Sequence, residues 1–258
     1  MSERVKIAVL GLGEAGSRLA ADLEAAGADV TGYDPDPVRG AAGTADVASA
    51  VARSAIVLSV NAAAVATAVA VSASPALGQD ALYADLNTAA PALKHELAEV
   101  VGPARFADVA LLGPVPARGL RTPALASGGG ARPFAEALGP LGMPVEVVSD
   151  TAGDAATLKL LRSVFTKGLA AAAIESHAAA EAAGHADWLD EQVAGVIGRP
   201  LLERLLEGSA RHAARRVDEM EAARELLLEL GIEPRVTDAS AALLATLEAG
   251  RDSVRGDG

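Results

Sequence analysis

The chain has no cysteine, few aromatic residues and no excess of positive charge. Without cysteine it can build no disulfide framework, thiolate nucleophile or cysteine-bound metal site. Aromatic residues make up 2% of the 258 residues, whereas hydrophobic residues make up 51%, and much of that share is alanine. We therefore expect close contacts of helices with one another and with a sheet, rather than large ring-lined cavities.

The charge balance is acidic. Against 34 aspartate and glutamate residues stand 22 lysine and arginine residues, which gives a net charge of −12. This balance argues against nucleic acid or an anionic membrane surface as a partner. The four histidines show no spacing typical of metal ligands, so we expect no metal site.

Long hydrophobic runs are lacking as well. The longest apolar stretch, residues 55–71, contains Ser59, Asn61 and Thr67 and is too weakly hydrophobic to span a bilayer. The start of the chain has mixed charge and only a short, glycine-broken apolar run, unlike a signal peptide. We expect a cytoplasmic protein that does not contact membranes.

Glycine is abundant and, at one place, patterned. Residues 6–16 form a short apolar strand that runs into G-x-G-x-x-G. In this motif Gly11 permits a tight turn, Gly13 lets the backbone approach a pyrophosphate, and Gly16 lets the next helix pack on the sheet. An amphipathic segment and a second strand follow, which makes a chance glycine-rich turn the weaker interpretation. The predicted dinucleotide-binding loop comprises Gly11, Leu12, Gly13, Glu14, Ala15 and Gly16.

The choice of cofactor depends on Asp34, which ends the second strand 23 residues after Gly11. An acidic side chain at this place accepts hydrogen bonds from the ribose hydroxyls of NAD and repels a 2′-phosphate. Arg39 lies nearby and can bind a phosphate, so NADP is the alternative. We predict NAD over NADP.

Two halves of the chain differ in pattern, which predicts an α/β fold with two domains. In residues 1–149 short apolar strands alternate with helical stretches, as in a doubly wound parallel Rossmann sheet. Residues 150–258 carry helical patterns alone and are expected to form an all-helical domain for substrate binding and dimerisation. The expected strands cover residues 6–10, 29–34, 55–60, 81–86, 105–110, 124–127 and 145–148.

The helical half begins with a long segment, residues 154–183, that is apolar on most faces. Such a helix is usually buried or shared between subunits, so we expect a homodimer. Further helices are expected over residues 191–206, with a break near Pro200, over 211–230 and from Thr237 onward.

Lys159 is the candidate for proton transfer, because it lies near the start of the long helix where the two domains must meet. Ser163 and Lys167 follow at spacings of four and share its helix face. A lysine partly desolvated in a cleft has a lowered pKa and can exchange a proton with a carbonyl or hydroxyl oxygen. From this pattern alone, a surface lysine on an ordinary helix is the more common case.

Four segments occur in a characteristic order along the chain: residues 11–16, 85–88 with Pro91, 108–114 and 153–159. Together they resemble the β-hydroxyacid dehydrogenase superfamily, which includes 3-hydroxyisobutyrate dehydrogenase and 6-phosphogluconate dehydrogenase. The helical half is most similar to a poorly characterised, divergent branch. The resemblance implies that Lys159 is the general acid and base, that Asn87 and Thr88 hold the substrate, and that Asn61 lines the nicotinamide side of the cofactor.

The chain departs from the family pattern at two places. The family usually has asparagine four residues after the lysine, where this chain has Ser163, and Lys167 is the candidate to compensate. The segment that binds the substrate carboxylate, usually Ser-Gly-Gly, reads Leu112-Gly113-Pro114. Gly113 matches the family pattern, but the serine hydroxyl is missing, and Pro114 lacks the backbone N–H donor of the second glycine. The common short 3-hydroxy acids are therefore doubtful substrates.

Four arginines are candidate ligands for an anionic substrate, because a guanidinium binds a carboxylate or phosphate with two hydrogen bonds. Arg118 and Arg121 lie in a loop, where they are either anion ligands or solvated charges. Arg215 and Arg216 lie in a helix, where the alternative is a pair of Arg215 with Glu219.

The sequence thus favours an NAD(P)-dependent dehydrogenase or reductase that transfers hydride to or from a small, anionic hydroxy acid or oxo compound. An imine reductase with the same fold is one alternative, and such enzymes usually lack a lysine at the position of Lys159. A sensor that binds NAD(H) without turnover is the other.

Overall fold

The computed structural model describes residues 4–40, 43–211 and 213–255. The chain forms two compact units, Met1–Lys159 and Leu160–Gly258. Helix α7 (Asp154–Ala183) runs through the division, so Lys159 is the last residue of the first unit. The domain boundary suggested by the sequence, between residues 149 and 150, stays a prediction.

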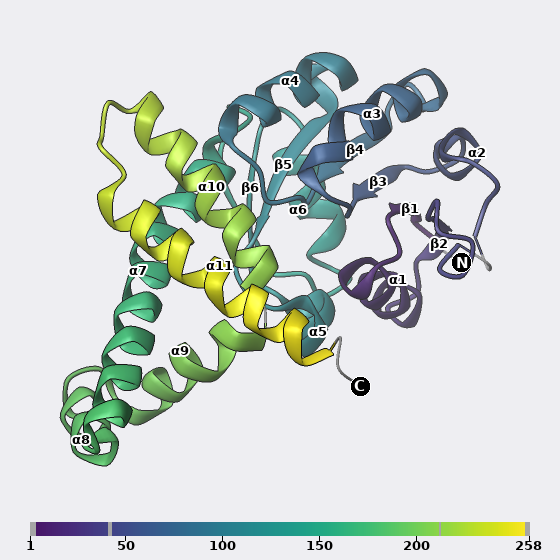
Figure 1. Cartoon of the computed structure of the whole chain (residues 1–258). Coiled ribbons are helices and arrows are strands. Elements are labelled where there is room, and N and C mark those ends of the chain that lie inside the picture. The colour runs from purple at the N-terminus through teal and green to yellow at the C-terminus, as the bar shows by residue number, and fades with distance from the viewer. Residues whose placement is uncertain (1–3, 41–42, 212, 256–258) are drawn as a thin grey trace. The chain divides into compact units, whose positions relative to one another are not determined.

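The first unit is built on a seven-stranded sheet in the order β2-β1-β3-β4-β5-β6-β7, which confirms the predicted α/β class (Figure 1). The order reverses between β1 and β3, as in a doubly wound sheet. The strands are β1 (Lys6–Leu10), β2 (Asp29–Tyr33), β3 (Ile56–Ser59), β4 (Leu82–Asp85), β5 (Phe106–Leu111), β6 (Ala124–Ser127) and β7 (Val145–Ser149).

Both faces of the sheet carry a core. In strand β1, Ile7 and Val9 are buried in one cluster with side chains of α1 and α6, whereas Ala8 and Leu10 are buried in a second cluster with side chains of α2, α3 and α4. This alternation follows from the two-residue period of a strand. The helices are α1 (Glu14–Ala25), α2 (Val47–Val51), α3 (Ala63–Ala73), α4 (Pro91–Val101) and α6 (Ala131–Leu138).

The expectation of a parallel sheet is wrong for one pair of strands. All other neighbours are parallel, but β5 and β6 are antiparallel, with Asp108 opposite Ser127. The connection between them holds only α5 (Val115–Arg118) and the single turn η3 (Gly119–Arg121). Without a long crossover helix the chain returns along the neighbouring strand in the opposite direction.

The second unit, in its described part, consists of helices alone. The expected break near Pro200 lies at Gly198, which separates α8 from α9, and Gly231, with a φ of +72°, follows the end of α10. Small side chains allow close packing: Ala170 and Ala173 of α7 lie in one cluster with Leu202 and Leu205 of α9. The helices after α7 are α8 (Ala186–Ile197), α9 (Arg199–Arg211), α10 (Ala213–Glu229) and α11 (Arg235–Arg255).

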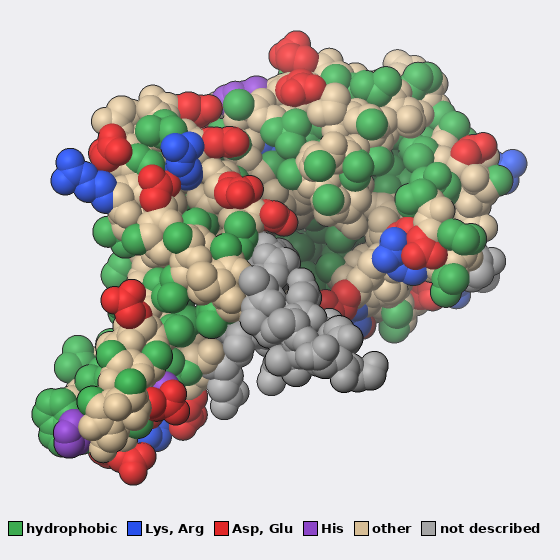
Figure 2. All heavy atoms as spheres, in the orientation of Figure 1, with side chains coloured by type: hydrophobic (Ala, Val, Ile, Leu, Met, Phe, Trp, Pro, Cys, Tyr) green, Lys and Arg blue, Asp and Glu red, His purple; other side chains and the backbone are tan. Residues whose placement is uncertain are grey.

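The surface reflects the composition. Acidic side chains are spread over the visible face (Figure 2). Within the described ranges, no helix has both the length and the apolar character needed to cross a membrane.

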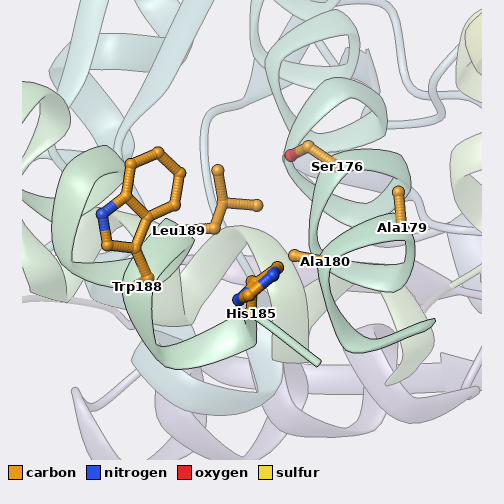
Figure 3. A pocket seen from close by; sticks show the side chains of 6 residues that line it. All are labelled: Ser176, Ala179, Ala180, His185, Trp188 and Leu189. Carbon is orange, nitrogen blue, oxygen red and sulfur yellow. The ribbon is translucent and has the colours of Figure 1, made fainter. Parts of the chain in front are cut away.

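An open pocket in the second unit is mostly apolar (Figure 3). Its lining is Ser176, Ala179, Ala180, His185, Trp188 and Leu189.

The turn after β1 yields a stability prediction. Gly11 has a φ of +102°, and a Cβ there would lie 2.2 Å from the carbonyl oxygen of Val60. Gly27 has a φ of +94° but no heavy atom within 4 Å of such a Cβ. Gly11→Ala should therefore lower the free energy of unfolding by about 2 kcal/mol or more, and Gly27→Ala by about 1 kcal/mol. Urea unfolding followed by circular dichroism measures both, and equal losses would contradict the predicted clash.

Candidate functional site

The candidate site lies at the carboxyl edge of the sheet. Gly11 directly follows β1, Asn61 lies two residues after β3, and Asn87 lies two residues after β4. In the parallel register Leu10 is paired with Ser59, and Ser59 with Asp85. The loops after these three strands therefore begin side by side, as at the ligand-binding edge of other doubly wound sheets.

The glycine loop fits a dinucleotide phosphate. At Gly16 a Cβ would lie 1.8 Å from the carbonyl oxygen of Gly11, so strand and helix approach too closely for any side chain. At Gly13 a Cβ would meet no heavy atom within 4 Å, so the open side of the loop is kept bare. Gly13 is also the N-cap of α1 and supplies no side-chain cap. The first N–H groups of α1 are thus available to an anion.

Asp34 lies directly after β2 and is connected to the glycine loop. Its carboxylate accepts hydrogen bonds from the N–H groups of Leu12 at 2.7 Å and Asp36 at 2.9 Å. Arg39 forms an ion pair with it at 3.3 Å. Burial raises the pKa of Asp34, but these hydrogen bonds and the guanidinium outweigh it, so the pKa lies below its ordinary value. A negatively charged hydrogen-bond acceptor therefore lies beside the glycine loop.

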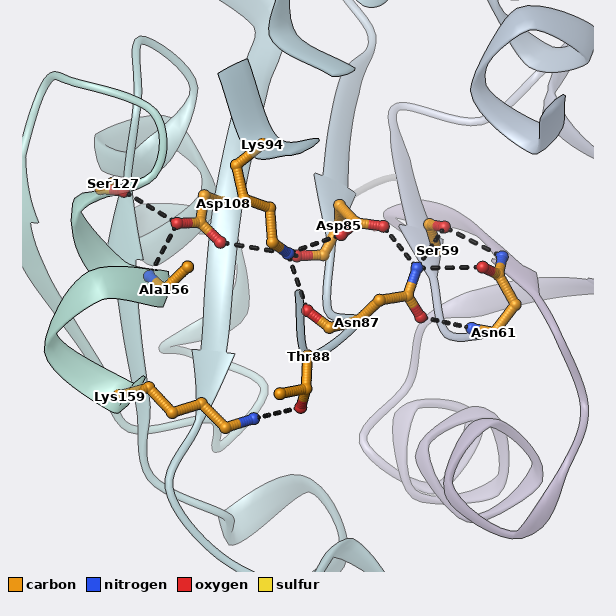
Figure 4. Close-up of polar contacts among 10 residues, drawn as sticks. All are labelled: Ser59, Asn61, Asp85, Asn87, Thr88, Lys94, Asp108, Ser127, Ala156 and Lys159. Atoms are coloured by element: carbon orange, nitrogen blue, oxygen red, sulfur yellow. Dashed lines mark hydrogen bonds and ion pairs between the residues drawn. The ribbon is translucent and has the colours of Figure 1, made fainter. Parts of the chain in front are cut away.

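Asn61 and Asn87 orient each other across the loops after β3 and β4 (Figure 4). The N–H of Asn61 donates to Oδ1 of Asn87 at 2.7 Å, and Nδ2 of Asn87 donates to Oδ1 of Asn61 at 2.9 Å. Nδ2 of Asn61 donates to Ser59 Oγ at 3.0 Å. The side-chain amides are therefore held in one orientation by reciprocal bonds.

The buried ammonium of Lys94 contacts Asn87 of this pair. Lys94 of α4 is 0% exposed, and its Nζ lies 2.6 Å from Oδ2 of Asp85 and 3.2 Å from Oδ1 of Asp108. It also donates to the carbonyl oxygens of Asn87 at 2.8 Å and Asp85 at 3.2 Å. Burial lowers the pKa of Lys94, but the two carboxylates more than offset it and raise the pKa above its ordinary value. The surroundings of Lys94 therefore favour its charged form.

Asp108 and Ser127 cap the start of α7 from the antiparallel strand pair. Oδ2 of Asp108 accepts the N–H of Ala156 at 2.9 Å, and Oγ of Ser127 accepts the N–H of Ala155 at 3.0 Å. A carboxylate at a helix N-terminus satisfies unpaired N–H groups and is favoured by the helix dipole. The first turn of α7 is thus fixed to β5 and β6.

Lys159 lies in this first part of α7 and contacts the loop after β4. Its Nζ donates to Oγ1 of Thr88 at 2.6 Å, and both side chains are partly exposed (Figure 4). Thr88 follows Asn87 directly, so the structure brings the predicted residues Asn61, Asn87, Thr88 and Lys159 to one edge of the first unit. The arrangement offers an amino group and a hydroxyl at the loop after β4, the strand that pairs with β3 ahead of Asn61.

Ser163 and Lys167 are bound to a partner that the sequence analysis did not assign to the site. Oγ of Ser163 and Nζ of Lys167 both donate to Oε1 of Glu219 in α10, the lysine at 2.9 Å. Burial lowers the pKa of Lys167, Glu219 opposes this, and the charges of Arg216 and Arg162 lower it further, so the net shift is downward. The second unit thus has a polar cluster of its own.

The remaining predicted residues are more scattered. Gly113 follows β5, and Arg118 and Arg121 are exposed in the connection to β6. Arg216 is half-buried in α10, and the side chain of Arg215 lies outside the described residues. Among the residues that are described, no cluster of three metal-ligating side chains occurs.

Lys94 is the main site residue that the sequence analysis missed. A usable signal was present, because Lys94 precedes Leu97, Ala98 and Val101 by three, four and seven residues, and all three are buried in α4. A lysine on the buried face of a helix requires partners. The structure supplies Asp85 and Asp108.

Two segments match known families. Residues 6–111 match the NAD binding domain of 6-phosphogluconate dehydrogenase, and residues 180–247 match a domain of unknown function, DUF1932. The uncharacterized 28.5 kDa protein in the 7S RNA 5′ region of Methanothermus fervidus is 30% identical over 156 residues, 59% of this chain. The match spans 61% of the length of that relative.

Solved structures extend the likeness to nearly the whole chain. A conserved hypothetical protein from Sinorhizobium meliloti 1021 is 32% identical with a TM-score of 0.76, over 95% of this chain and 88% of that one. Mycobacterium tuberculosis 3-hydroxyisobutyrate dehydrogenase, solved with L-serine, has the same fold, with 18% identity, a TM-score of 0.79 and coverage of 96% and 94%. An imine reductase from Pseudomonas sp. also shares the fold, with 22% identity, a TM-score of 0.63 and coverage of 96% and 95%.

These matches agree with the glycine loop and with the strand order around it. The chain therefore carries an NAD binding domain of the 6-phosphogluconate dehydrogenase family in its first half and a DUF1932 domain in its helical half, and it shares its fold with 3-hydroxyisobutyrate dehydrogenase.

Proposed function

We propose that the protein transfers hydride between NAD(H) and a small, anionic hydroxy acid or its oxo counterpart, with Lys159 as general acid and base. The observation that carries the proposal is the 2.6 Å hydrogen bond from Lys159 to Thr88. In this bond the ε-amino group of Lys159 lies against the loop after β4, and the neighbouring strand β3 leads into the loop that contains Asn61. A proton donor at the cofactor edge is what carbonyl reduction needs besides the hydride.

The residues present fit a nicotinamide dinucleotide. Gly11, Gly13 and Gly16 would hold the pyrophosphate at the start of α1, Asp34 would accept from the adenosine ribose, and Asn61 would lie on the nicotinamide side. When bound, the nicotinamide supplies or accepts the hydride. The residues of this chain would bind the cofactor and the substrate, orient them and transfer the proton.

Lys159 would protonate the oxygen of a carbonyl group during reduction and take the proton back from the hydroxyl during oxidation. The Thr88 oxygen accepts from the Lys159 ammonium, so the Thr88 hydroxyl hydrogen is available to a substrate oxygen. A positively charged Lys159 also favours an anionic substrate. Asn87, Gly113, Ser163 and Lys167 stay predicted substrate contacts.

A homodimer in the cytoplasm stays part of the proposal. Leu161 and Phe165 of α7 are 42% and 71% exposed, and Trp188 of α8 is 65% exposed. Large apolar side chains exposed on helices are typical of surfaces that are covered by another chain.

The role of Lys159 is tested by Lys159→Met. We expect kcat for reduction of small oxo acids and semialdehydes to fall by about 10² to 10⁴-fold, because the proton donor is lost, while the Kd for NADH changes little. Lys6→Met, at the amino end of β1, is the matched control. Unchanged turnover in Lys159→Met would refute general acid catalysis by this residue. Turnover of imines alone, or tight NADH binding without any turnover, would favour an imine reductase or a sensor instead.

The role of the bare loop is tested by Gly13→Ala. Gly13 has a φ of −65°, so alanine fits the backbone, and the free energy of unfolding should change by less than about 1 kcal/mol. The Kd for NADH, measured by calorimetry, should rise about tenfold or more, because the methyl group occupies the space of the pyrophosphate. Gly195→Ala, also in open space, should leave the Kd unchanged. An unaltered Kd in Gly13→Ala would contradict the proposed phosphate site.

The choice of nucleotide is tested by Asp34→Ala. The wild-type protein should bind NADH more tightly than NADPH, and the variant should lose about tenfold or more of that preference, since the charge that repels a 2′-phosphate is gone. Arg39→Met is the companion variant, because Arg39 pairs with Asp34 and is the nearby candidate for a phosphate contact. Tighter binding of NADPH to the wild-type protein, or an unchanged ratio in Asp34→Ala, would contradict the assignment to NAD.

A further inference from the structure

Lys94 is connected to both segments that meet at Lys159, directly to the loop of Thr88 and through Asp108 to the first turn of α7. We propose that Lys94 is a positioning residue, which holds the loop of Thr88 and the first turn of α7 in the one arrangement that lets Lys159 reach Thr88. The proposal rests on the proposed role of Lys159 and deepens it. Lys94 itself is 0% exposed and cannot touch a substrate.

The first connection is to the loop after β4. Nζ of Lys94 donates to the main-chain carbonyl oxygen of Asn87 at 2.8 Å, and this residue directly precedes Thr88. The same ammonium pairs with Oδ2 of Asp85 at 2.6 Å, while Oδ1 of Asp85 accepts from Nδ2 of Asn87 at 2.6 Å. Both the main chain and the side chain of Asn87 are therefore fixed through one cation.

The second connection is to α7. Oδ1 of Asp108 lies 3.2 Å from the ammonium of Lys94, and its other oxygen accepts the N–H of Ala156 at 2.9 Å. Ala156 precedes Lys159 by three residues, less than one helical turn and about 4.5 Å along the helix axis. A displacement of Asp108 is thus passed on to Lys159 over a short, stiff segment.

A direct contact of α4 with the start of α7 supports this coupling. A Cβ at Gly153, just before α7, would lie 3.0 Å from Nε2 of His95 and 3.2 Å from Cβ of Pro91. Gly153 also has a φ of +93°, which favours glycine. The turn that begins α7 therefore lies directly against the first turn of α4, which carries Lys94.

The charges explain why an ammonium is needed at this place. The buried group consists of one cation and the two carboxylates of Asp85 and Asp108. The N-terminus of α7 and the Asn87 amide compensate the remaining negative charge. Without the cation two buried carboxylates would face each other with no opposite charge between them, which is costly in the low-dielectric interior. Asp108 would then be released from its arrangement between Lys94 and α7.

Burial of an ion pair does not by itself argue for stability, because apolar replacements of such pairs are often neutral. The interaction does define one geometry. Four oxygen atoms, from β4, from the loop after it and from β5, surround Nζ of Lys94. A purely stabilising role and a positioning role therefore predict different results when the charge is removed.

The test is Lys94→Met, with Arg105→Met as the matched control. Arg105 is a cation that donates to the carbonyl oxygen of Val101 at the opposite end of α4. In Lys94→Met the amides of Ala155 and Ala156 should exchange hydrogen about tenfold or more faster, with the amides of β1 unchanged, because the anchoring of α7 and of the Thr88 loop is lost while β1 keeps its contacts. Arg105→Met should leave both sets of rates as in the wild-type protein.

Kinetics provide the second readout. In Lys94→Met kcat should fall about 10- to 100-fold while the Kd for NADH stays within about threefold. In a background of Lys159→Met the same substitution should cost no further activity, because Lys94 acts through Lys159. An additive loss in the double variant, or exchange that rises uniformly over the whole sheet, would overturn the proposal in favour of a merely structural role.

If Lys94→Met does not fold, Asp108→Asn tests the same proposal. The amide oxygen can still accept from Ala156 but no longer pairs with the ammonium, so faster exchange at residues 155–156 and a 3- to 10-fold lower kcat are expected. Unchanged exchange there would overturn the proposal. Full turnover of Lys159→Met would refute only the proposed function, since the exchange rates still report whether Lys94 anchors α7.

Discussion

The first unit depends on one buried interaction, the ammonium of Lys94 between the carboxylates of Asp85 and Asp108. It joins three elements that follow one another in the sequence, strand β4, helix α4 and strand β5, and, through Asp108, the distant start of α7. An ammonium can satisfy several oxygens at once only when all of them converge, so the interaction requires the surrounding loops to adopt one arrangement. The polar residues of the candidate site lie on these loops.

The sheet supplies the other constraint. Because β1, β3 and β4 run parallel and in register, the loops that follow them emerge at one edge, where the glycine turn, Asn61 and Asn87 gather. The antiparallel pair β5 and β6 departs from this rule and places Asp108 opposite Ser127, and both cap α7. The cofactor edge and the start of the helix that bears Lys159 are thus connected through hydrogen bonds within one unit.

Local patterns in the sequence were sufficient for the glycine loop, the strands and the long helix, because turn glycines and apolar periodicity act over a few residues. They were insufficient where the structure depends on contacts between segments that are distant in the sequence. Ser163 and Lys167 share a helix face as expected, but their bond to Glu219, more than 50 residues away, depends on how α7 and α10 pack. The antiparallel β6 follows from a short connection rather than from its own residues. Lys94 carried a local signal, yet its partners Asp85 and Asp108 are defined only by the sheet.

We infer that the glycine loop and the loops of Asn61 and Thr88 form one nucleotide-binding edge. Hydrogen exchange of the full chain with and without NADH, read peptide by peptide, tests it directly. We expect slower exchange in residues 10–17, 59–62 and 85–89, with α6 unchanged. Slower exchange confined to other parts of the chain, or none at NADH concentrations that saturate binding, would contradict it.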